Sequence, residues 1–163
     1  MRCILMIALV SIWLNATCIQ MLNETDEWKG NIKISYCDGN KIQIYLKNKN
    51  QFLTDYSKMI TLTEFNKMIN GYKKTLKWYD KAKKMKITID KNIFLIPNNL
   101  ALDFDSRDNA SFISIVIFGE NSSVESGFFS ISKRGKLADI ISKLKNIKDN
   151  GKAKFKKQSS AFN

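Results

Sequence analysis

Three aspartates, Asp103, Asp105 and Asp108, are the carboxylates whose spacing comes nearest to a chemical motif in this sequence. Carboxylate oxygens bind hard divalent cations, and two carboxylates on one side of a strand can act as acid and base. The spacing lacks the glycine and the distal glutamate of a calcium loop, which favours a plain polar turn. The alternative is a divalent-cation site that serves a carboxylate-based hydrolase, and it requires these side chains to converge.

Other reactive groups are scarce, because the chain contains no histidine. This absence excludes His-based catalytic triads, His-ligated zinc or iron sites and the commonest pH switch. Cys37 has no histidine to activate it, so a cysteine nucleophile is not indicated either. We find no pattern for a cofactor. The sequence therefore favours a binding protein over an enzyme.

The net charge of +12 comes from two lysine-rich stretches. Residues 73–86 carry a net charge of +6 and residues 133–157 one of +8, whereas residues 87–132 carry −4. This concentration of positive charge favours an anionic membrane surface, a cell-wall polymer or an acidic protein as partner. The candidate binding residues are Lys73, Lys74, Lys77, Trp78, Lys81, Lys84, Lys143, Lys145 and Lys148.

The alternative interpretation of this charge is an ordinary solvated surface. Lysine lacks the rigid fork with which arginine binds phosphate in two places at once, and nucleic acid is further disfavoured by the export predicted below. Trp78 lies among Lys74, Lys77 and Lys81, which is typical of residues at a membrane or sugar surface. Packing at the edge of a helix interface accounts for Trp78 equally well.

The N-terminal residues have the layout of a signal peptide. Arg2 precedes an apolar run over residues 4–14, which is too short to cross a bilayer because that takes about 20 residues. We predict export to a bacterial periplasm or cell surface with residues 1–18 removed. Lipid anchoring at Cys18 is the alternative. Either outcome leaves Cys37 without a cysteine partner and excludes a disulfide-stapled domain.

Two patterns in the first half of the chain predict well-defined elements. Apolar and polar residues alternate over 31–36 and 42–46 around Asp38-Gly39, which predicts a β-hairpin. Thr61 followed by Glu64 is a capping-box pattern, and the apolar stripe behind it predicts a helix over about 62–84.

In the second half, strand patterns occupy residues 87–131 and predict a central strand over 112–118. A second amphipathic helix is predicted over about 135–149. The order of elements has no βαβ alternation, and no sequence repeat of 20 to 50 residues is present. We therefore predict an α+β fold in which both helices pack on one face of an antiparallel sheet of about five to six strands.

The predicted organisation is a single α+β domain over residues 19–151, with an irregular lead at 19–30 and a flexible basic tail at 152–163. If both helices lie on the same face, their lysines form one positive surface. An anionic or acidic partner would bind there, which is the function the sequence favours. A structural role, in which the apolar stripe or a sheet edge pairs with another chain, is the remaining alternative.

Overall fold

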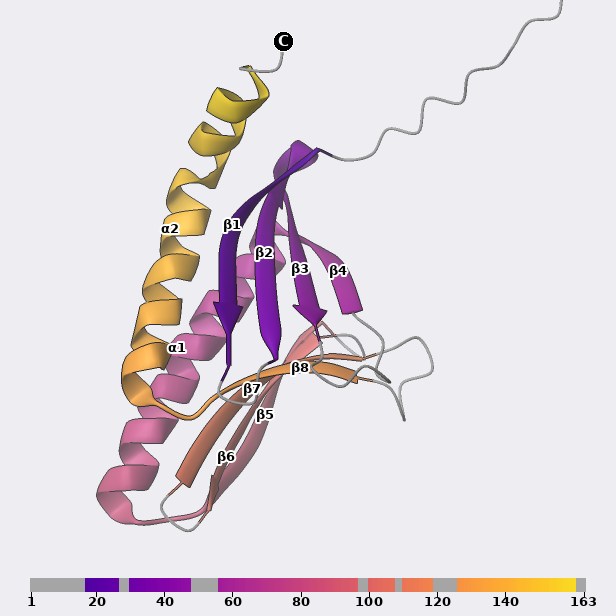
Figure 1. Ribbon diagram of the computed structural model, residues 1–163. Coiled ribbons are helices and arrows are strands. Elements are labelled where there is room, and N and C mark those ends of the chain that lie inside the picture. The colour runs from indigo at the N-terminus through magenta and orange to yellow at the C-terminus, as the bar shows by residue number, and fades with distance from the viewer. Residues whose placement is uncertain are drawn as a thin grey trace, which may run out of the picture.

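A computed structural model describes residues 17–26, 30–47, 56–96, 100–107, 110–118 and 126–160 of the chain. These residues form an α+β fold with two antiparallel sheets and two long helices packed against them (Figure 1). The predicted fold class is therefore confirmed. The prediction of one sheet with five to six strands is wrong, because the described strands divide into two sheets of four.

Neighbouring strands follow the chain order in both sheets, and every pair is antiparallel. The first sheet consists of β1 (Cys18–Thr25), β2 (Asn31–Cys37), β3 (Lys41–Lys47) and β4 (Tyr56–Thr61), followed by helix α1 (Leu62–Met85). The second sheet consists of β5 (Ile89–Ile96), β6 (Leu100–Arg107), β7 (Ala110–Phe118) and β8 (Ser126–Ile131), followed by helix α2 (Arg134–Ser159). The chain thus passes twice through four strands and a helix.

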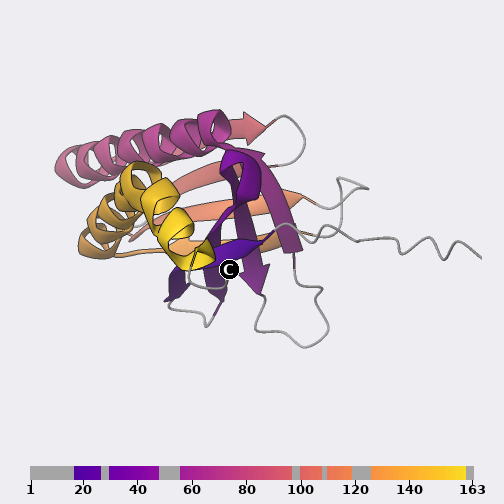
Figure 2. The same cartoon turned by 90° about the horizontal axis from the view of Figure 1, so that it is seen from above.

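The two helices lie side by side on one side of the sheets (Figure 2). Each helix contacts mainly the sheet of the other half: α1 packs on β5 and β6, and α2 packs on β1 and β2. Gly71 of α1, for example, lies against the side chains of Leu95 and Leu102. Buried side chains from both sheets and both helices form one hydrophobic core.

The predicted hairpin is confirmed as β2 and β3. Ile32 and Ile34 are buried on the face toward the core, while Lys33 between them is half-buried on the open face. The tight turn that joins the strands needs left-handed backbone, and Gly39 and Asn40 adopt φ values of 68° and 57° there.

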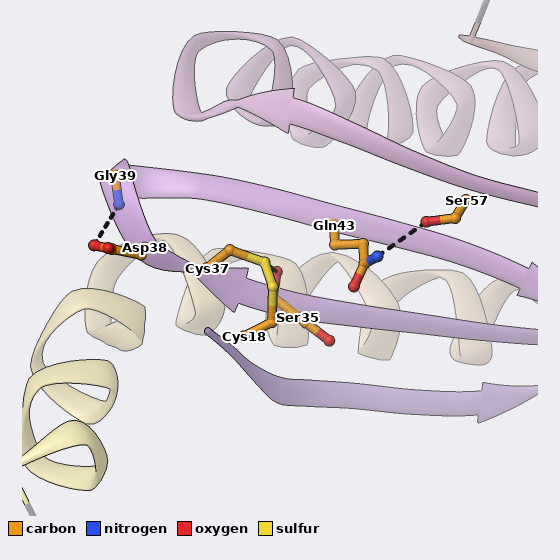
Figure 3. The surroundings of a disulfide bond; sticks show 7 residues. All are labelled: Cys18, Ser35, Cys37, Asp38, Gly39, Gln43 and Ser57. Atoms are coloured by element: carbon orange, nitrogen blue, oxygen red, sulfur yellow. Dashed lines mark hydrogen bonds between the residues drawn. A yellow bond between two sulfur atoms is a disulfide. The ribbon is translucent and has the colours of Figure 1, made fainter. Parts of the chain in front are cut away.

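Cys18 and Cys37 form a disulfide at the end of this hairpin, across the β1–β2 pair (Figure 3). The prediction that Cys37 is unpaired is therefore wrong. A cut before Ile19 would remove Cys18, and a lipid thioether would occupy the sulfur that the disulfide uses. Both predictions for Cys18 are incompatible with this bond.

Helix α1 begins where its capping pattern predicts. The Thr61 hydroxyl accepts a hydrogen bond from the Glu64 N–H at 3.2 Å, and the Glu64 carboxylate accepts one from the Thr61 N–H at 2.8 Å. These two bonds use N–H groups that have no partner inside the helix. The helix ends at Met85, one residue beyond the predicted boundary.

Two segments differ from their predictions. Residues 19–25 are not an irregular lead, because they belong to β1; a register shift between Gln20 and Leu22 breaks the alternation that would have indicated a strand. Residues 152–159 are not an irregular tail, because α2 continues to Ser159. Residues 161–163 lie outside the described part of the chain.

Asp26, directly after β1, links the first sheet to the second through hydrogen bonds to its carboxylate. Its side chain is 6% exposed, and its carboxylate accepts hydrogen bonds from the Gly30 N–H at 2.7 Å and the Ser130 N–H at 3.0 Å. Ser130 lies in β8, the edge strand of the second sheet. These two hydrogen bonds connect the end of β1 and the residue before β2 to β8.

Candidate functional site

The outer surface of the two helices brings most of the predicted binding lysines into one layer. The helices run in opposite directions and lie side by side over part of their length (Figure 1). Seven of the predicted binding lysines are exposed on these helices, and we call them the lysine surface. They are Lys73, Lys74, Lys77, Lys81, Lys84, Lys145 and Lys148. None of these lysines has an ion-pair partner among the described residues.

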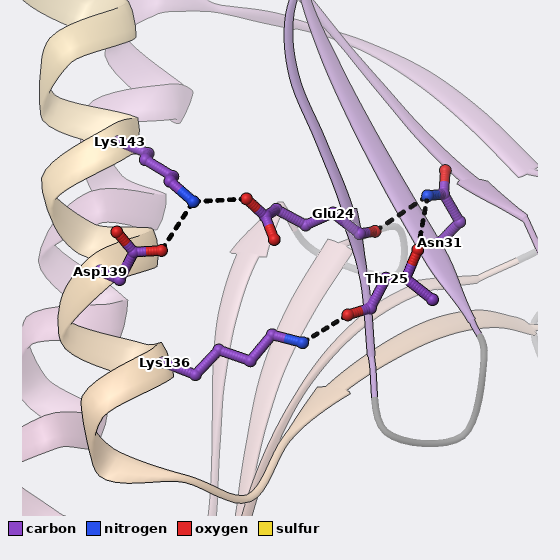
Figure 4. Close-up of polar contacts among 6 residues, drawn as sticks. All are labelled: Glu24, Thr25, Asn31, Lys136, Asp139 and Lys143. Carbon is purple, nitrogen blue, oxygen red and sulfur yellow. Dashed lines mark hydrogen bonds and ion pairs between the residues drawn. The ribbon is translucent and has the colours of Figure 1, made fainter.

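Lys143, the remaining predicted lysine, forms ion pairs within the protein. Its ammonium lies 2.5 Å from a Glu24 carboxylate oxygen and 2.7 Å from one of Asp139 (Figure 4). The hydrogen bonds to Asp139 and Glu24 raise the pKa of Lys143. Lys136, about two turns earlier, donates to the Thr25 carbonyl. Lys143 and Lys136 therefore fix α2 to β1.

Arg134 is engaged in the same way at the start of α2. Its guanidinium donates to both carboxylate oxygens of Asp80, at 2.6 and 2.9 Å, and so ties α2 to α1. The hydrogen bond from Arg134 holds the pKa of Asp80 below its ordinary value. Both side chains are about half exposed, so the bond contributes little stability and serves mainly to align the helices.

Trp78 lies at the border between the core and the lysine surface. Its ring packs 5.9 Å from the ring of Phe104 in β6, and the Lys74 ammonium lies 5.1 Å from the Trp78 ring centroid. A cation over an indole face is an attractive arrangement. Trp78 therefore packs at the edge of a helix interface and also carries a lysine on its ring, and its role at a membrane or sugar surface stays a prediction.

The predicted carboxylate site lies on the opposite side of the second sheet. Asp103 and Asp105 alternate with Leu102 and Phe104 along β6. Because Leu102 and Phe104 are buried toward α1, the two aspartates share the outer face of the strand. Burial, and then the neighbouring Asp90, raise the pKa of Asp103. Asp105 accepts a hydrogen bond from Arg107 at 3.0 Å.

Asp108, the third member of that predicted site, lies outside the described residues. Among the residues that are described, no cluster of three or more His, Cys, Asp or Glu side chains is placed to hold a metal ion. The structure thus puts Asp103 and Asp105 on one face, as strand alternation predicted, without a metal-ligand set around them.

A cavity of about 410 Å³ lies at the C-terminal end of α1, between the helix and the paired ends of β6 and β7. Ser106 and Ser111 line it, and they are 6% and 8% exposed. The Ser111 hydroxyl donates to the Ser106 hydroxyl at 3.1 Å. The remaining lining residues are Tyr79, Ala82, Lys83, Lys86, Ile87 and Thr88. The cavity is therefore lined by two cations and several hydroxyl groups.

This cavity was not among the predicted sites, although the sequence of its two strands carries a signal for it. Ser106 follows the same inward alternation as Phe104, and Ser111 the same as Ile113. The two serines are also partners in the β6–β7 register. Two serines at inward-facing strand positions, where apolar residues are expected, indicate that the core ends there and a polar cavity begins.

Comparison of the chain with known protein families, with curated proteins and with solved structures finds no match. In the described part of the chain, neither helix is long and apolar enough to span a bilayer. The lysine surface and the cavity are therefore the features of the molecule that bear on its function.

Proposed function

We propose that the protein is an exported, non-enzymatic binding protein of the bacterial envelope that attaches to an anionic partner through the lysine surface of α1 and α2. The observation that carries the proposal is the separation of charge between helices and sheets. Residues 62–86 hold eight lysines and two acids, and residues 133–160 hold ten basic residues and two acids. The other described residues hold six basic and six acidic ones, so the charge resides in the helices.

This arrangement suits attraction to an extended anionic surface. Charges on one side of a molecule add their potentials, which steer association and orient the protein toward its partner. Lysine has a long, flexible side chain and one compact charge, which fits a surface with many loosely placed anions better than one rigid site. A membrane with anionic lipids, an anionic cell-wall polymer and an acidic protein all present this chemistry.

The disulfide supports export, because such bonds persist in oxidising compartments outside the cytosol. The Thr17 carbonyl accepts a hydrogen bond from the Asp38 N–H at 3.0 Å, so the fold includes residues from Thr17 onward. Cleavage of the signal after Ala16 would leave both Thr17 and Cys18 in the mature protein. We therefore place the cut there instead of before Ile19.

The proposal is tested by binding to three anionic probes: vesicles that contain phosphatidylglycerol, a glycerol phosphate polymer, and polyglutamate. We expect binding to at least one of them, and none to neutral phosphatidylcholine vesicles. Binding should weaken steeply between about 0.05 and 0.5 M salt, because the screening length shortens from above 10 Å toward a few Å over this range.

Two variants of equal charge change make the test specific. In the first, Lys73, Lys77, Lys145 and Lys148 of the lysine surface are replaced by glutamine, and we expect a loss of affinity of about tenfold or more. In the second, the sheet lysines Lys33, Lys41, Lys47 and Lys58 are replaced, and affinity should change less than about threefold. Equal losses in the two variants, or no binding to any anionic probe, would contradict the proposal.

A further inference from the structure

The C-terminal end of α1 combines exposed apolar side chains with lysines. Met85 and Ile87 are 55% and 38% exposed, and together with Met59 they are the large apolar side chains most open to solvent in the described residues. Lys83, Lys84 and Lys86 lie beside them in the sequence and are exposed as well. We call residues 83–87 the α1 tip. Its composition is that of a segment whose apolar side chains enter a bilayer surface while lysines reach the headgroups.

The tip continues a stripe of the same character along α1. Lys74, Trp78, Lys81 and Met85 recur every three or four residues, so they share one side of the helix. Trp78 is partly exposed in this stripe, and tryptophan is enriched where a membrane meets water. A flat surface approached by this side of α1 would therefore contact cationic, aromatic and apolar groups together.

The hydroxyl-lined cavity opens directly at the tip, because Lys83, Lys86 and Ile87 belong to both. Its volume of about 410 Å³ falls in the range of about 300–1,000 Å³ found for small-ligand sites. Ser106 accepts the hydrogen bond from Ser111 and keeps its own O–H proton for another acceptor. No described carboxylate lies within ion-pair distance of Lys83 or Lys86. Such a set of cations and donors suits an anion with several oxygens.

We infer that this cavity binds the phosphate of an anionic phospholipid headgroup while Met85 and Ile87 enter the surface of the bilayer. Lys83 and Lys86 supply the positive charge, and the Ser106 hydroxyl supplies a hydrogen bond from the cavity wall. The inference rests on the proposed function and commits it to one partner, a membrane that contains anionic lipid. It also fixes the end of the molecule that approaches the membrane first.

At Lys86 the charge can be removed by a substitution that should not destabilise the protein. It follows α1 with φ 51° and ψ 45°, a left-handed conformation that glycine adopts at less cost than lysine. Lys86→Gly therefore removes the ammonium while it relaxes the backbone. We expect its thermal midpoint to be at least that of the wild type and its affinity for phosphatidylglycerol vesicles to fall about fivefold. Lys41→Gln, an exposed lysine of β3, is the control and should keep its affinity within about twofold.

Two further variants address the other parts of the site. Met85→Ser changes a residue of the tip that does not line the cavity, so it should lower vesicle affinity roughly fivefold and leave the affinity for soluble glycerol 3-phosphate unchanged. Ser106→Ala combined with Ser111→Ala should lower both affinities. Soluble glycerol 3-phosphate, measured by calorimetry, separates the lipid headgroup from a free phosphate as the source of the anion. If the soluble compound binds and Met85→Ser binds vesicles like the wild type, the membrane assignment is wrong.

The outcomes also separate this inference from the proposed function. If all three tip and cavity variants bind phosphatidylglycerol vesicles like the wild type, while the four-lysine helix variant does not, the inference is wrong and the proposed function stands. The same holds if the wild type binds polyglutamate or the glycerol phosphate polymer but no vesicle. If the wild type binds none of the anionic probes, both are wrong.

Discussion

Gly151 of α2 lies directly against the ring of Tyr36 in β2. A Cβ atom built at Gly151 would come within 2.4 Å of Tyr36 Cδ2 and 2.9 Å of Cε2. One turn further along α2, the ring of Phe155 packs 6.0 Å from the same tyrosine. The far half of α2 is therefore seated on the first sheet through one aromatic side chain, and the absence of a side chain at Gly151 permits that approach.

This contact predicts the effect of Gly151→Ala. Alanine favours the helix by about 1 kcal/mol relative to glycine, but here its methyl group would overlap a buried ring that has little room to move. We expect a net loss of about 1–3 kcal/mol in the free energy of unfolding, measured with urea. Gly135→Ala is the matched control, because a Cβ at Gly135 meets nothing within 4 Å, and it should be neutral or stabilising. A Gly151→Ala variant as stable as the wild type would show that α2 is not seated in this way.

The disulfide predicts a dependence on redox conditions. Cys18 and Cys37 are 19 residues apart, and closing a loop of about this length in the unfolded chain stabilises a protein by roughly 3 kcal/mol. Replacing both cysteines by alanine should therefore lower the free energy of unfolding by about that amount. A reducing agent should destabilise the wild type and leave the double variant unaffected. Alkylation of the unreduced, folded protein at either cysteine, detected by mass spectrometry, is the result that would disprove the bond.

Tyr72 predicts a specific behaviour at alkaline pH. Its side chain is 1% exposed, its hydroxyl has no hydrogen-bond partner among the described residues, and burial raises its pKa far above the ordinary value of 10.0. The unfolded chain releases this proton near pH 10 and the folded chain retains it. The free energy of unfolding is therefore unaffected well below that pH, and it falls as the pH rises above it.

Tyr72→Phe should make this alkaline decline shallower, which can be measured by urea unfolding between about pH 8 and pH 11. It should also raise stability at neutral pH by about 1 kcal/mol, since it removes a buried hydroxyl without a partner. Tyr36→Phe provides the contrast, because the Tyr36 hydroxyl donates to Asn40 at 2.8 Å and its loss should be destabilising. Parallel alkaline declines for the wild type and Tyr72→Phe would refute the prediction.

Elements with a strong local pattern could be predicted from sequence, and elements defined by distant partners could not. The β2–β3 hairpin and α1 carry their own turn and cap, so their boundaries were predictable to within a residue or two. β4 has only Ile60 buried, and its place beside β3 follows from pairing that no local pattern contains. The second helix was predicted to end at about residue 149, whereas α2 continues past Gly151, where the missing side chain admits the ring of Tyr36.

The candidate site divides in the same way. The lysines of α1 and α2 were visible in the sequence, because exposed charge is a property of each residue and its helix. Lys143 looked like its neighbours, and only the tertiary contact with Glu24 in β1 shows that it is engaged. The Cys18–Cys37 bond was not predicted, because the predicted signal peptide ended at Cys18, two residues later than a fold starting at Thr17 allows.

Because each helix packs on the sheet of the other half of the chain, the fold restricts when its core can form during synthesis. A polypeptide is made from its N-terminus, so β1 and β2 emerge long before α2, the 26-residue helix that covers them. α1 follows its own sheet at once, yet most of its buried face waits for β5 and β6. Neither half can close its core during synthesis, and the native structure forms only when nearly the whole chain is free to fold.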